Sequence, residues 1–274
     1  MIFNLVNFSN QLKNVGVYWK YLTPNFELYL DNYLKTFENY RSLIKIVPTT
    51  EKDWKLLPYG KFSKDSSWKW RRQSLEIINK NIEGKIFDCT LEIGSWNGWL
   101  TKTLAKKSKN VIATDYFVCP FDGIGNISLL EKNITAIQCN IDTIKTDFKP
   151  NSFDLIVLNH NLSYMNNPVA YINDLIPLLK SNGIIISLGN TFFKNPENKI
   201  KKNLFFANQF YNKYHLNLYI QPVKGYMDFN DMKLLKVSGF QIKKYKSKFW
   251  QNCYTKFYPK APLYTYITYK NDIQ

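Results

Sequence analysis

The sequence has few of the features that mark metal-binding or disulfide-stabilised proteins. None of its cysteines forms a CxxC pair or lies at a metal-ligand spacing from a histidine; they are Cys89, Cys119, Cys139 and Cys253. This pattern indicates neither a zinc site nor a disulfide framework. We therefore expect free thiols in a reducing compartment and no bound metal.

Long apolar runs are also missing. The N-terminal stretch MIFNLVNFSNQLKNVGVYWK contains Asn, Gln and Lys where a signal peptide would need a continuous apolar region. No window reaches the roughly 20 apolar residues of a membrane-spanning helix. Hydrophobic residues nevertheless make up 45% of the chain, which is ample for a buried core. We expect a folded, cytoplasmic protein without a membrane span.

Arginine is scarce although the chain is strongly basic. The formal net charge is +16, and of the 37 basic residues only Arg41, Arg71 and Arg72 are arginine. Positive potential attracts polyanions, which leaves RNA, acidic lipid or a phosphorylated substrate open as partners. An excess of lysine together with abundant Asn and Ile is also expected for any protein encoded by an AT-rich genome. The net charge alone therefore does not identify the partner.

Residues 1–84 are rich in aromatic side chains and poor in strand patterns. Their apolar spacing predicts helices around 9–21, 26–46 and 67–82. The last of these begins after Asp65, a residue type that favours helix N-termini. We expect a mainly helical extension or lid, followed by a separate domain over residues 85–274.

Residues 85–190 alternate short apolar runs with helical patterns. The predicted strands are 85–93, 110–115, 134–140, 153–159 and 183–189. The predicted helices between them lie near 98–108, 126–132 and 167–180. Apolar strands joined by crossover helices indicate a Rossmann-like α/β fold, with a mostly parallel sheet covered on both faces.

Residues 191–274 continue with a charged, aromatic helix over 197–214 and a shorter helix near 229–240. Two strand-like stretches follow, FQIKKYK and LYTYITYK. We expect them to form an antiparallel pair at the end of the sheet. Segment 191–230 is a candidate lid insertion, because with residues 1–84 it is the part of the chain outside the predicted sheet that could cover a bound ligand.

Glycines and polar residues gather where the predicted strands end, which is the edge where open parallel sheets bind ligands. The first strand ends at Glu92 and continues into the turn Gly94-Ser95-Trp96-Asn97-Gly98. Glycine permits the backbone angles of a tight turn and lets a ligand approach the main chain. The second strand ends at Asp115, a carboxylate suited to accept hydrogen bonds from both ribose hydroxyls.

The order of these features resembles the class I S-adenosylmethionine-dependent methyltransferases. Their acid-x-Gly-x-x-x-Gly motif is matched by Glu92, Gly94 and Gly98, and their ribose-binding acid by Asp115 in VIATDYF. The resemblance covers about 85–190 and extends more loosely to 242. It implies S-adenosylmethionine as the cofactor.

The resemblance also implies which residues would contact that cofactor. Asp142 and the backbone beside Thr143 would face the adenine, with Tyr116 stacking near it. The full set implied is Glu92, Gly94, Ser95, Trp96, Asn97, Gly98, Asp115, Tyr116, Asp142, Thr143 and Asn159.

Trp96 departs from the family pattern, because relatives usually carry a third glycine at this position. A tryptophan there could crowd the methionine end of the cofactor. A dinucleotide fingerprint counted from Gly94 would need glycines at 96 and 99, where this chain has Trp96 and Trp99. This bulk argues against a pyrophosphate-binding turn.

Methyl transfer is an in-line displacement in which the cofactor supplies the reactivity and the protein aligns the acceptor. If the acceptor is a hydroxyl or ammonium, a general base helps, and His160 is the natural candidate. A structural role for this histidine is the alternative, and Tyr164 is a second candidate. Arg71 and Arg72 lie in WKWRRQS. One hypothesis is that they bind the methionine carboxylate or an anionic substrate, and the alternative is that they are solvated surface groups.

The sequence thus predicts a methyltransferase that acts on oxygen or nitrogen of a small or medium organic acceptor, and anionic acceptors are among the candidates. An RNA methyltransferase is the first alternative, with KIKK and KKYKSK as RNA contacts. A binding module that keeps the fold without catalysis is the second. Cofactor binding would separate the enzymes from that module.

Overall fold

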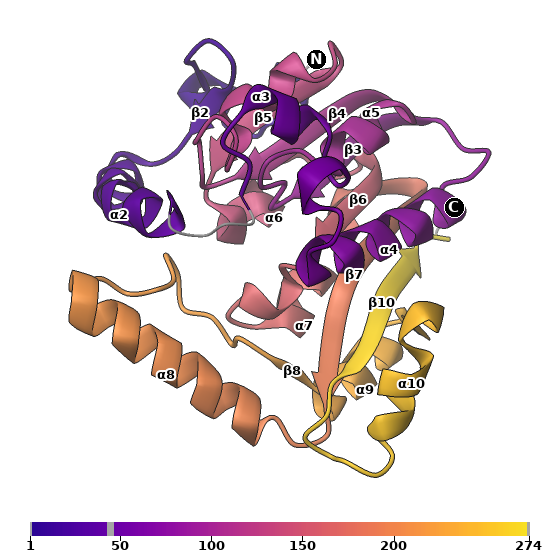
Figure 1. Ribbon diagram of the computed structural model, residues 1–274. Helices are drawn as coiled ribbons and strands as arrows, with labels where there is room; N and C mark the ends of the chain where they lie inside the picture. Colours follow the sequence, from indigo (N-terminus) through magenta and orange to yellow (C-terminus); the bar gives the residue numbers. More distant parts are fainter. Residues whose placement is uncertain (1, 43–46, 273–274) are drawn as a thin grey trace. The chain divides into compact units, whose positions relative to one another are not determined.

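The computed structural model describes residues 2–42 and 47–272 (Figure 1). The chain divides into two compact units. The first holds the described residues up to Leu158, together with Pro177–Ile184 and 271–272, and the second holds Asn159–Ile176 and Ile185–Lys270. The first unit includes residues from both sides of position 84, and the expected domain division at that position stays a prediction.

The first unit consists of helices and a mostly parallel sheet. Its helices are α1 (Ile2–Leu5), α2 (Pro24–Ser42), α3 (Glu51–Lys55), α4 (Ser66–Asn81), α5 (Thr101–Ala105) and α6 (Ile144–Asp147). Its strands are β1 (Lys13–Asn14), β2 (Trp19–Tyr21), β3 (Phe87–Ile93), β4 (Ser108–Asp115), β5 (Ile134–Cys139) and β6 (Phe153–Asn159), followed by the start of β7 (Leu179–Phe193).

The strand order in this unit is β1-β2-β5-β4-β3-β6, followed by β7. The pairs β2–β5, β5–β4, β4–β3 and β3–β6 are parallel. The carboxyl ends of the central strands therefore lie along one edge, where Asp115 of β4 is in register with Gln138 of β5. Leu91 and Ile93 of β3 are fully buried, as expected for a strand covered on both faces.

The expected Rossmann-like, mostly parallel sheet is confirmed, but one predicted helix is wrong. Residues 9–21 form a short 3-10 turn and the strands β1 and β2. Gly16 has a φ of 100°, which breaks the helical backbone, and the β-formers around it favour strands. β2 then adds to the sheet beside β5.

Other boundaries differ for local reasons. The helix expected over 167–180 ends at Asp174, because Pro177 cannot continue it. The helix expected over 26–46 is α2, and its last expected residues, 43–46, lie outside the described part of the chain. α4 begins as expected, because the Asp65 carboxylate accepts hydrogen bonds from the amides of Ser67 and Trp68.

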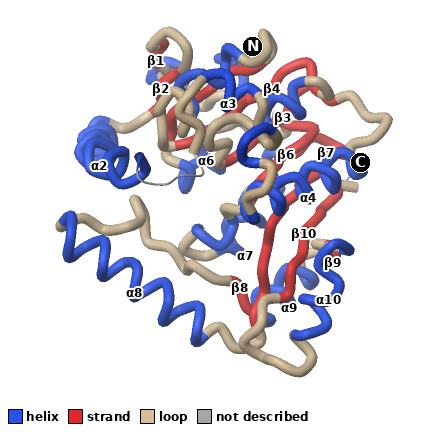
Figure 2. Tube along the Cα trace, in the orientation of Figure 1, coloured by secondary structure: helices blue, strands red, loops and turns tan. Residues whose placement is uncertain are grey.

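The second unit contains the rest of β7 and the C-terminal strands. Its remaining elements are α7 (Pro168–Asp174), α8 (Glu197–Tyr214), β8 (Met227–Asp228), α9 (Phe229–Val237), β9 (Gln241–Lys244), α10 (Phe249–Tyr254) and β10 (Leu263–Lys270). The strand order is β7-β10-β9, and β9 and β10 form the expected antiparallel pair. A long loop connects α8 to β8 (Figure 2).

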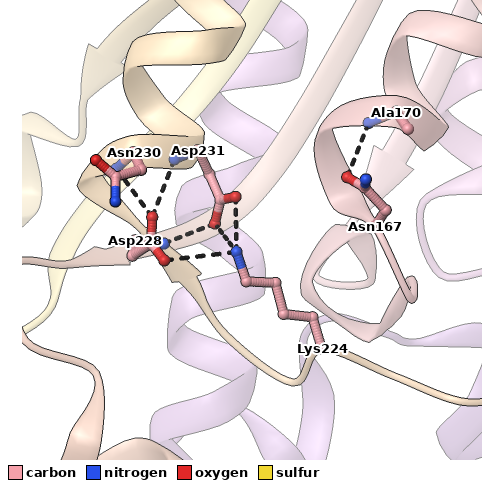
Figure 3. Close-up of polar contacts among 6 residues, drawn as sticks. All are labelled: Asn167, Ala170, Lys224, Asp228, Asn230 and Asp231. Atoms are coloured by element: carbon pink, nitrogen blue, oxygen red, sulfur yellow. Dashed lines mark hydrogen bonds and ion pairs between the residues drawn. The ribbon is translucent and has the colours of Figure 1, made fainter.

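The start of α9 is held by a closed set of polar contacts (Figure 3). The Asp228 side chain accepts hydrogen bonds from the amides of Asn230 and Asp231, at 2.9 and 3.0 Å. The Asp231 carboxylate in turn accepts one from the Asp228 amide, which completes a capping box. The Lys224 ammonium donates to both oxygens of Asp231, at 2.7 and 2.6 Å, and so ties the preceding loop to the helix.

Candidate functional site

The turn after β3 has an unusual backbone. Gly94, Trp96 and Gly98 all have positive φ, at 67°, 52° and 74°. A Cβ on Gly98 would lie 2.9 Å from Cγ1 of Ile127, so a side chain there would clash as well as strain the backbone. A bulky residue such as Trp96 in the left-handed region costs roughly 1–3 kcal/mol. This explains why a glycine suits position 96, and it shows that other contacts must hold the tryptophan in place.

The Trp96 side chain is held by a cluster of aromatic and charged groups. Its ring stacks on that of Trp68, with the centroids 5.3 Å apart and the planes 20° from parallel. Its indole N–H donates a hydrogen bond to Asp122. The Arg71 guanidinium lies 4.8 Å from the Trp96 ring centroid. These three contacts thus hold the Trp96 side chain in place beside the turn.

Arg41 completes this cluster through a two-point ion pair with Asp122. Its Nε and Nη2 atoms lie 2.8 and 2.6 Å from the two carboxylate oxygens. Burial lowers the pKa of Arg41, but the hydrogen bonds and charge of Asp122 outweigh it, so the net shift is upward. Neither residue was predicted from the sequence, where the only signal was that Arg41 is one of three arginines.

Glu92 is buried at the end of β3, with 1% of its surface exposed. Its carboxyl accepts a hydrogen bond from the Thr101 hydroxyl at 2.6 Å. Burial raises the pKa of Glu92 to about 8; the Thr101 bond lowers it and the charge of Asp115 raises it further. At neutral pH this group is therefore mostly protonated.

Asp115 is also buried, and its carboxylate holds the turn together. It accepts backbone hydrogen bonds from Trp96, Tyr116 and Phe117, at 2.7, 2.7 and 3.1 Å. Burial raises the pKa of Asp115 to about 6 in spite of these three bonds. A carboxylate offers about four acceptor positions, so about one is left for a ligand. Its role in ribose binding stays a prediction.

Tyr116 and Asp142, which were expected on the adenine side, both contact Asn140, a residue that was not predicted from the sequence. The Asn140 side-chain oxygen accepts hydrogen bonds from the Tyr116 hydroxyl at 3.2 Å and from the Asp142 amide at 3.1 Å. Burial raises the pKa of Asp142. The Tyr116 ring packs against Phe26, with the centroids 6.0 Å apart. This side of the site thus offers an aromatic ring and a half-buried carboxylate.

Two buried side-chain amides at the strand ends have polar atoms without partners in the described part of the chain. Both Nδ2 and Oδ1 of Asn97 lack a hydrogen bond, and Asn97 is fully buried. Oε1 of Gln138 also lacks a hydrogen bond within the described residues. A buried amide without partners costs about 1–3 kcal/mol, which a bound polar ligand would recover. The turn therefore fits a polar cofactor, although Trp96 and the three amide bonds of Asp115 restrict the space and the acceptors on offer.

The two arginines of WKWRRQS have different surroundings. Arg71 lies beside the Trp96 ring, within the cluster described above. Arg72 donates hydrogen bonds to the carbonyl oxygens of Pro58 and Ser63, at 3.1 and 2.5 Å. Of the two, only Arg71 lies next to the turn, and substrate binding by either stays a prediction.

The remaining candidates, Asn159, His160 and Tyr164, belong to the second unit. His160 has a φ of 59°, and its amide donates to the Leu188 carbonyl at 3.0 Å. Its imidazole lies directly over Gly189, where a Cβ would come within 2.4 Å of Nδ1. The Gly189 amide donates to the Tyr245 hydroxyl oxygen at 2.8 Å. His160 therefore has a fixed orientation, whereas Tyr164 is exposed.

Among residues 2–42 and 47–272 there is no group of three or more His, Cys, Asp or Glu that could hold a metal ion. Within the same residues, no helix is long and apolar enough to cross a membrane.

Residues 91–187 match a family model described as a methyltransferase domain. Over this stretch the chain is similar to methyltransferase domains. The matched range begins in β3 and contains the glycine turn, Asp115 and Asp142. The resemblance to the class I methyltransferases is thereby confirmed, and with it the expectation of an enzyme of that kind. No curated protein matches the sequence.

Solved structures share the fold of this methyltransferase domain at low sequence identity. A chain in the complex of a Haloferax volcanii methyltransferase with the Trm112 activator is 10% identical, with a TM-score of 0.51, over 75% of this chain and 91% of that chain. Geranyl diphosphate methyltransferase, solved with GPP and sinefungin, is 9% identical, with a TM-score of 0.50. The match covers 75% of this chain and 80% of that chain. At these identities the likeness shows the fold alone.

Proposed function

We propose that this chain is an S-adenosylmethionine-dependent methyltransferase that acts on oxygen or nitrogen of a small or medium organic acceptor. The observation that carries the proposal is the position of the buried Asn97 side-chain amide, which has no hydrogen-bond partner among the residues that the structure describes. It lies in the positive-φ turn after β3, inside the range that matches a methyltransferase domain. The cofactor supplies a methyl group activated on a sulfonium, so the protein needs to bind, orient and shield.

The residues of the first unit would hold the cofactor in three parts. We assign its amino-acid part to the turn, with Glu92 and Asn97. Asp115 is assigned to the ribose, through the acceptor position that its amide bonds leave. The adenine is assigned to Tyr116 and Asp142, which Asn140 holds together. Binding of a cationic group near Glu92 would lower the pKa of its carboxyl and release a proton.

A cavity in the second unit supports an organic acceptor. It has a volume of about 410 Å³ and lies between α8 and residues 217–226. This size is within the range of small-molecule sites. Of its lining residues only Lys224 is charged, and the Lys224 ammonium is already bound to Asp231. The lining is otherwise aromatic, aliphatic and amide, which favours an uncharged acceptor.

His160 is the candidate base in this proposal. Its packing against Gly189 gives the imidazole one orientation, as a group that removes a proton from an aligned acceptor requires. Tyr164, with its ring centroid 5.9 Å from that of Tyr219, is a weaker candidate because its side chain is exposed.

Calorimetry with S-adenosylmethionine and with its demethylated product tests the proposal. We expect both to bind to the wild-type chain, with proton release that is larger at pH 7 than at pH 9, because Glu92 is already ionised at the higher pH. Absence of binding at millimolar concentration would contradict the enzyme proposals. RNA that binds more weakly as salt increases and accepts a labelled methyl group would favour the RNA alternative.

A further inference from the structure

A second cavity in the second unit has a basic lining. Its volume is about 320 Å³, and it shares no residue with the cavity beside α8. Residues of α9, β9 and β10 and residues just after α10 line it. Its charged lining residues are all lysines, namely Lys194, Lys236, Lys244 and Lys256. We call this cavity the lysine pocket.

A buried hydroxyl group also lines the lysine pocket. Thr265 is fully buried, and in the described part of the chain its Oγ1 has no hydrogen-bond partner. Thr265 and Leu263 are two residues apart on β10, so both point to the same face, and both line the pocket. Lys244 is directly opposite Thr265 in the β9–β10 register. A hydroxyl donor and an ammonium are thus held side by side on two paired strands.

The charges around the pocket favour an anion. Residues 232–271 contain nine lysines and no aspartate or glutamate. Among the described residues, the ion pairs of the second unit involve other lysines, since Lys201 and Lys260 pair with Glu197 and Lys224 pairs with Asp231. Lys194 lies 5.9 Å from the Phe229 ring centroid, a contact that leaves its N–H donors available.

We propose that the lysine pocket binds a phosphate group. Ammonium groups bind phosphate as point charges, and a hydroxyl adds one directed hydrogen bond. A phosphate oxygen would satisfy the buried Thr265 hydroxyl, which explains a polar group that otherwise destabilises the fold.

Two sources of such a phosphate group fit the surroundings. One is a free phosphate or phosphorylated small molecule. The other is the headgroup of an anionic lipid, because the chain beside the pocket exposes aromatic side chains of the kind found at membrane interfaces. These are Phe249, Trp250, Tyr254, Phe257 and Tyr258.

Binding to the full chain tests the proposal with two probes. Calorimetry measures the binding of inorganic phosphate. Flotation measures binding to vesicles of phosphatidylcholine with and without phosphatidic acid. The pocket variant is the double substitution Lys236→Gln and Lys244→Gln. The matched control is Lys233→Gln and Lys243→Gln, which removes the same charge from the same two elements at residues that do not line the pocket.

We expect the pocket variant to weaken binding by about tenfold or more, and the control by less than about twofold. Thr265→Val should also weaken binding, yet it should not lower the melting temperature, because it removes an unsatisfied hydroxyl and keeps the side-chain shape. Binding of free phosphate alone identifies a small molecule as the source. Tighter binding to phosphatidic acid vesicles, lost in the pocket variant, identifies a lipid headgroup.

Three results would overturn the proposal. The first is that neither probe binds. The second is that the pocket variant and the control lose the same affinity, which would show only diffuse surface charge. The third is that RNA competes and both double variants release it equally, which would assign the lysines to a nucleic-acid surface.

Discussion

The two units differ in where they place their charged groups. In the first, Glu92 and Asp115 are buried at the strand ends, and burial raises the pKa of both carboxyls. In the second, the four lysines of the lysine pocket are exposed. A buried acid is costly until a ligand compensates it, whereas an exposed ammonium attracts anions from a distance. Under the functions proposed here, the first unit selects its cofactor by polar fit, whereas the lysine pocket selects its ligand by charge.

The largest effect is expected at His160, a second-unit residue. His160→Ala should lower turnover by about 100-fold or more, because it removes the candidate base, and it should leave S-adenosylmethionine affinity nearly intact. Steady-state kinetics and calorimetry check the two parts. The control is His215→Ala, at the other histidine, which caps α8. Unchanged turnover in His160→Ala would assign this residue a structural role.

Next in size is the pH dependence of stability that Glu92 imposes on the first unit. Its pKa is about 8 in the folded chain and 4.5 ordinarily, so between these values the folded state keeps a proton that the unfolded state loses. The free energy of unfolding should therefore fall as the pH rises, by about 2 kcal/mol between pH 6.5 and 8. Glu92→Gln should abolish this decline.

Denaturant unfolding of Glu92→Gln and the wild type at several pH values provides the measurement. The Asp115 carboxyl also lowers the free energy of unfolding as the pH rises, but mostly below its pKa of about 6. The range above pH 6.5 therefore isolates the contribution of Glu92. Parallel curves for the two proteins would show that Glu92 is ionised in the folded chain.

A smaller effect is expected from Asn97→Leu. Loss of the amide should weaken S-adenosylmethionine binding by about tenfold without lowering the melting temperature, because the amide has no partners to lose within the described chain. Asn133→Leu is the matched contrast, since Asn133 Nδ2 donates to the carbonyls of Ala105 and Ser108. It should lower stability by about 1–3 kcal/mol and leave affinity unchanged. Equal affinity losses in both would remove Asn97 from the site.

The smallest effect is expected from Trp96→Phe. The stack on Trp68 can remain, but the hydrogen bond to Asp122 is lost, which should lower stability by about 1 kcal/mol. Cofactor affinity should change by less than about twofold, because the partners of the indole hold it beside the turn. A marked gain in affinity, measured by calorimetry, would instead show that the tryptophan crowds the cofactor.

Much of the sheet could be predicted because strands buried on both faces are apolar runs of limited length, as in β3, β4 and β6. The strand-end acids could be predicted for a related reason, since polar residues that interrupt such runs mark the edge of the sheet. β2 could not, because its three residues gain their partner from β5, far along the chain. Local patterns carry no information about such a pairing.

Within the site, residue positions could be predicted better than residue environments. Asp115 was expected as a ribose acid, but its bonds to three backbone amides depend on the folded turn. Asn140 and Asp122 carry no motif, because each has a partner that is distant in sequence, Tyr116 for Asn140 and Arg41 for Asp122. The lysine pocket was equally hidden, since its four lysines come from separate segments.

β7 has a consequence for how this protein can be divided. The chain crosses between the two units after Leu158, Ile176, Ile184 and Lys270, and the third crossing falls inside β7. The methyltransferase match also ends within this strand, at residue 187. A gene fragment that stops at either boundary would cut β7 and leave an unpaired strand edge, which promotes aggregation. We therefore expect neither unit to fold well when it is expressed without the other.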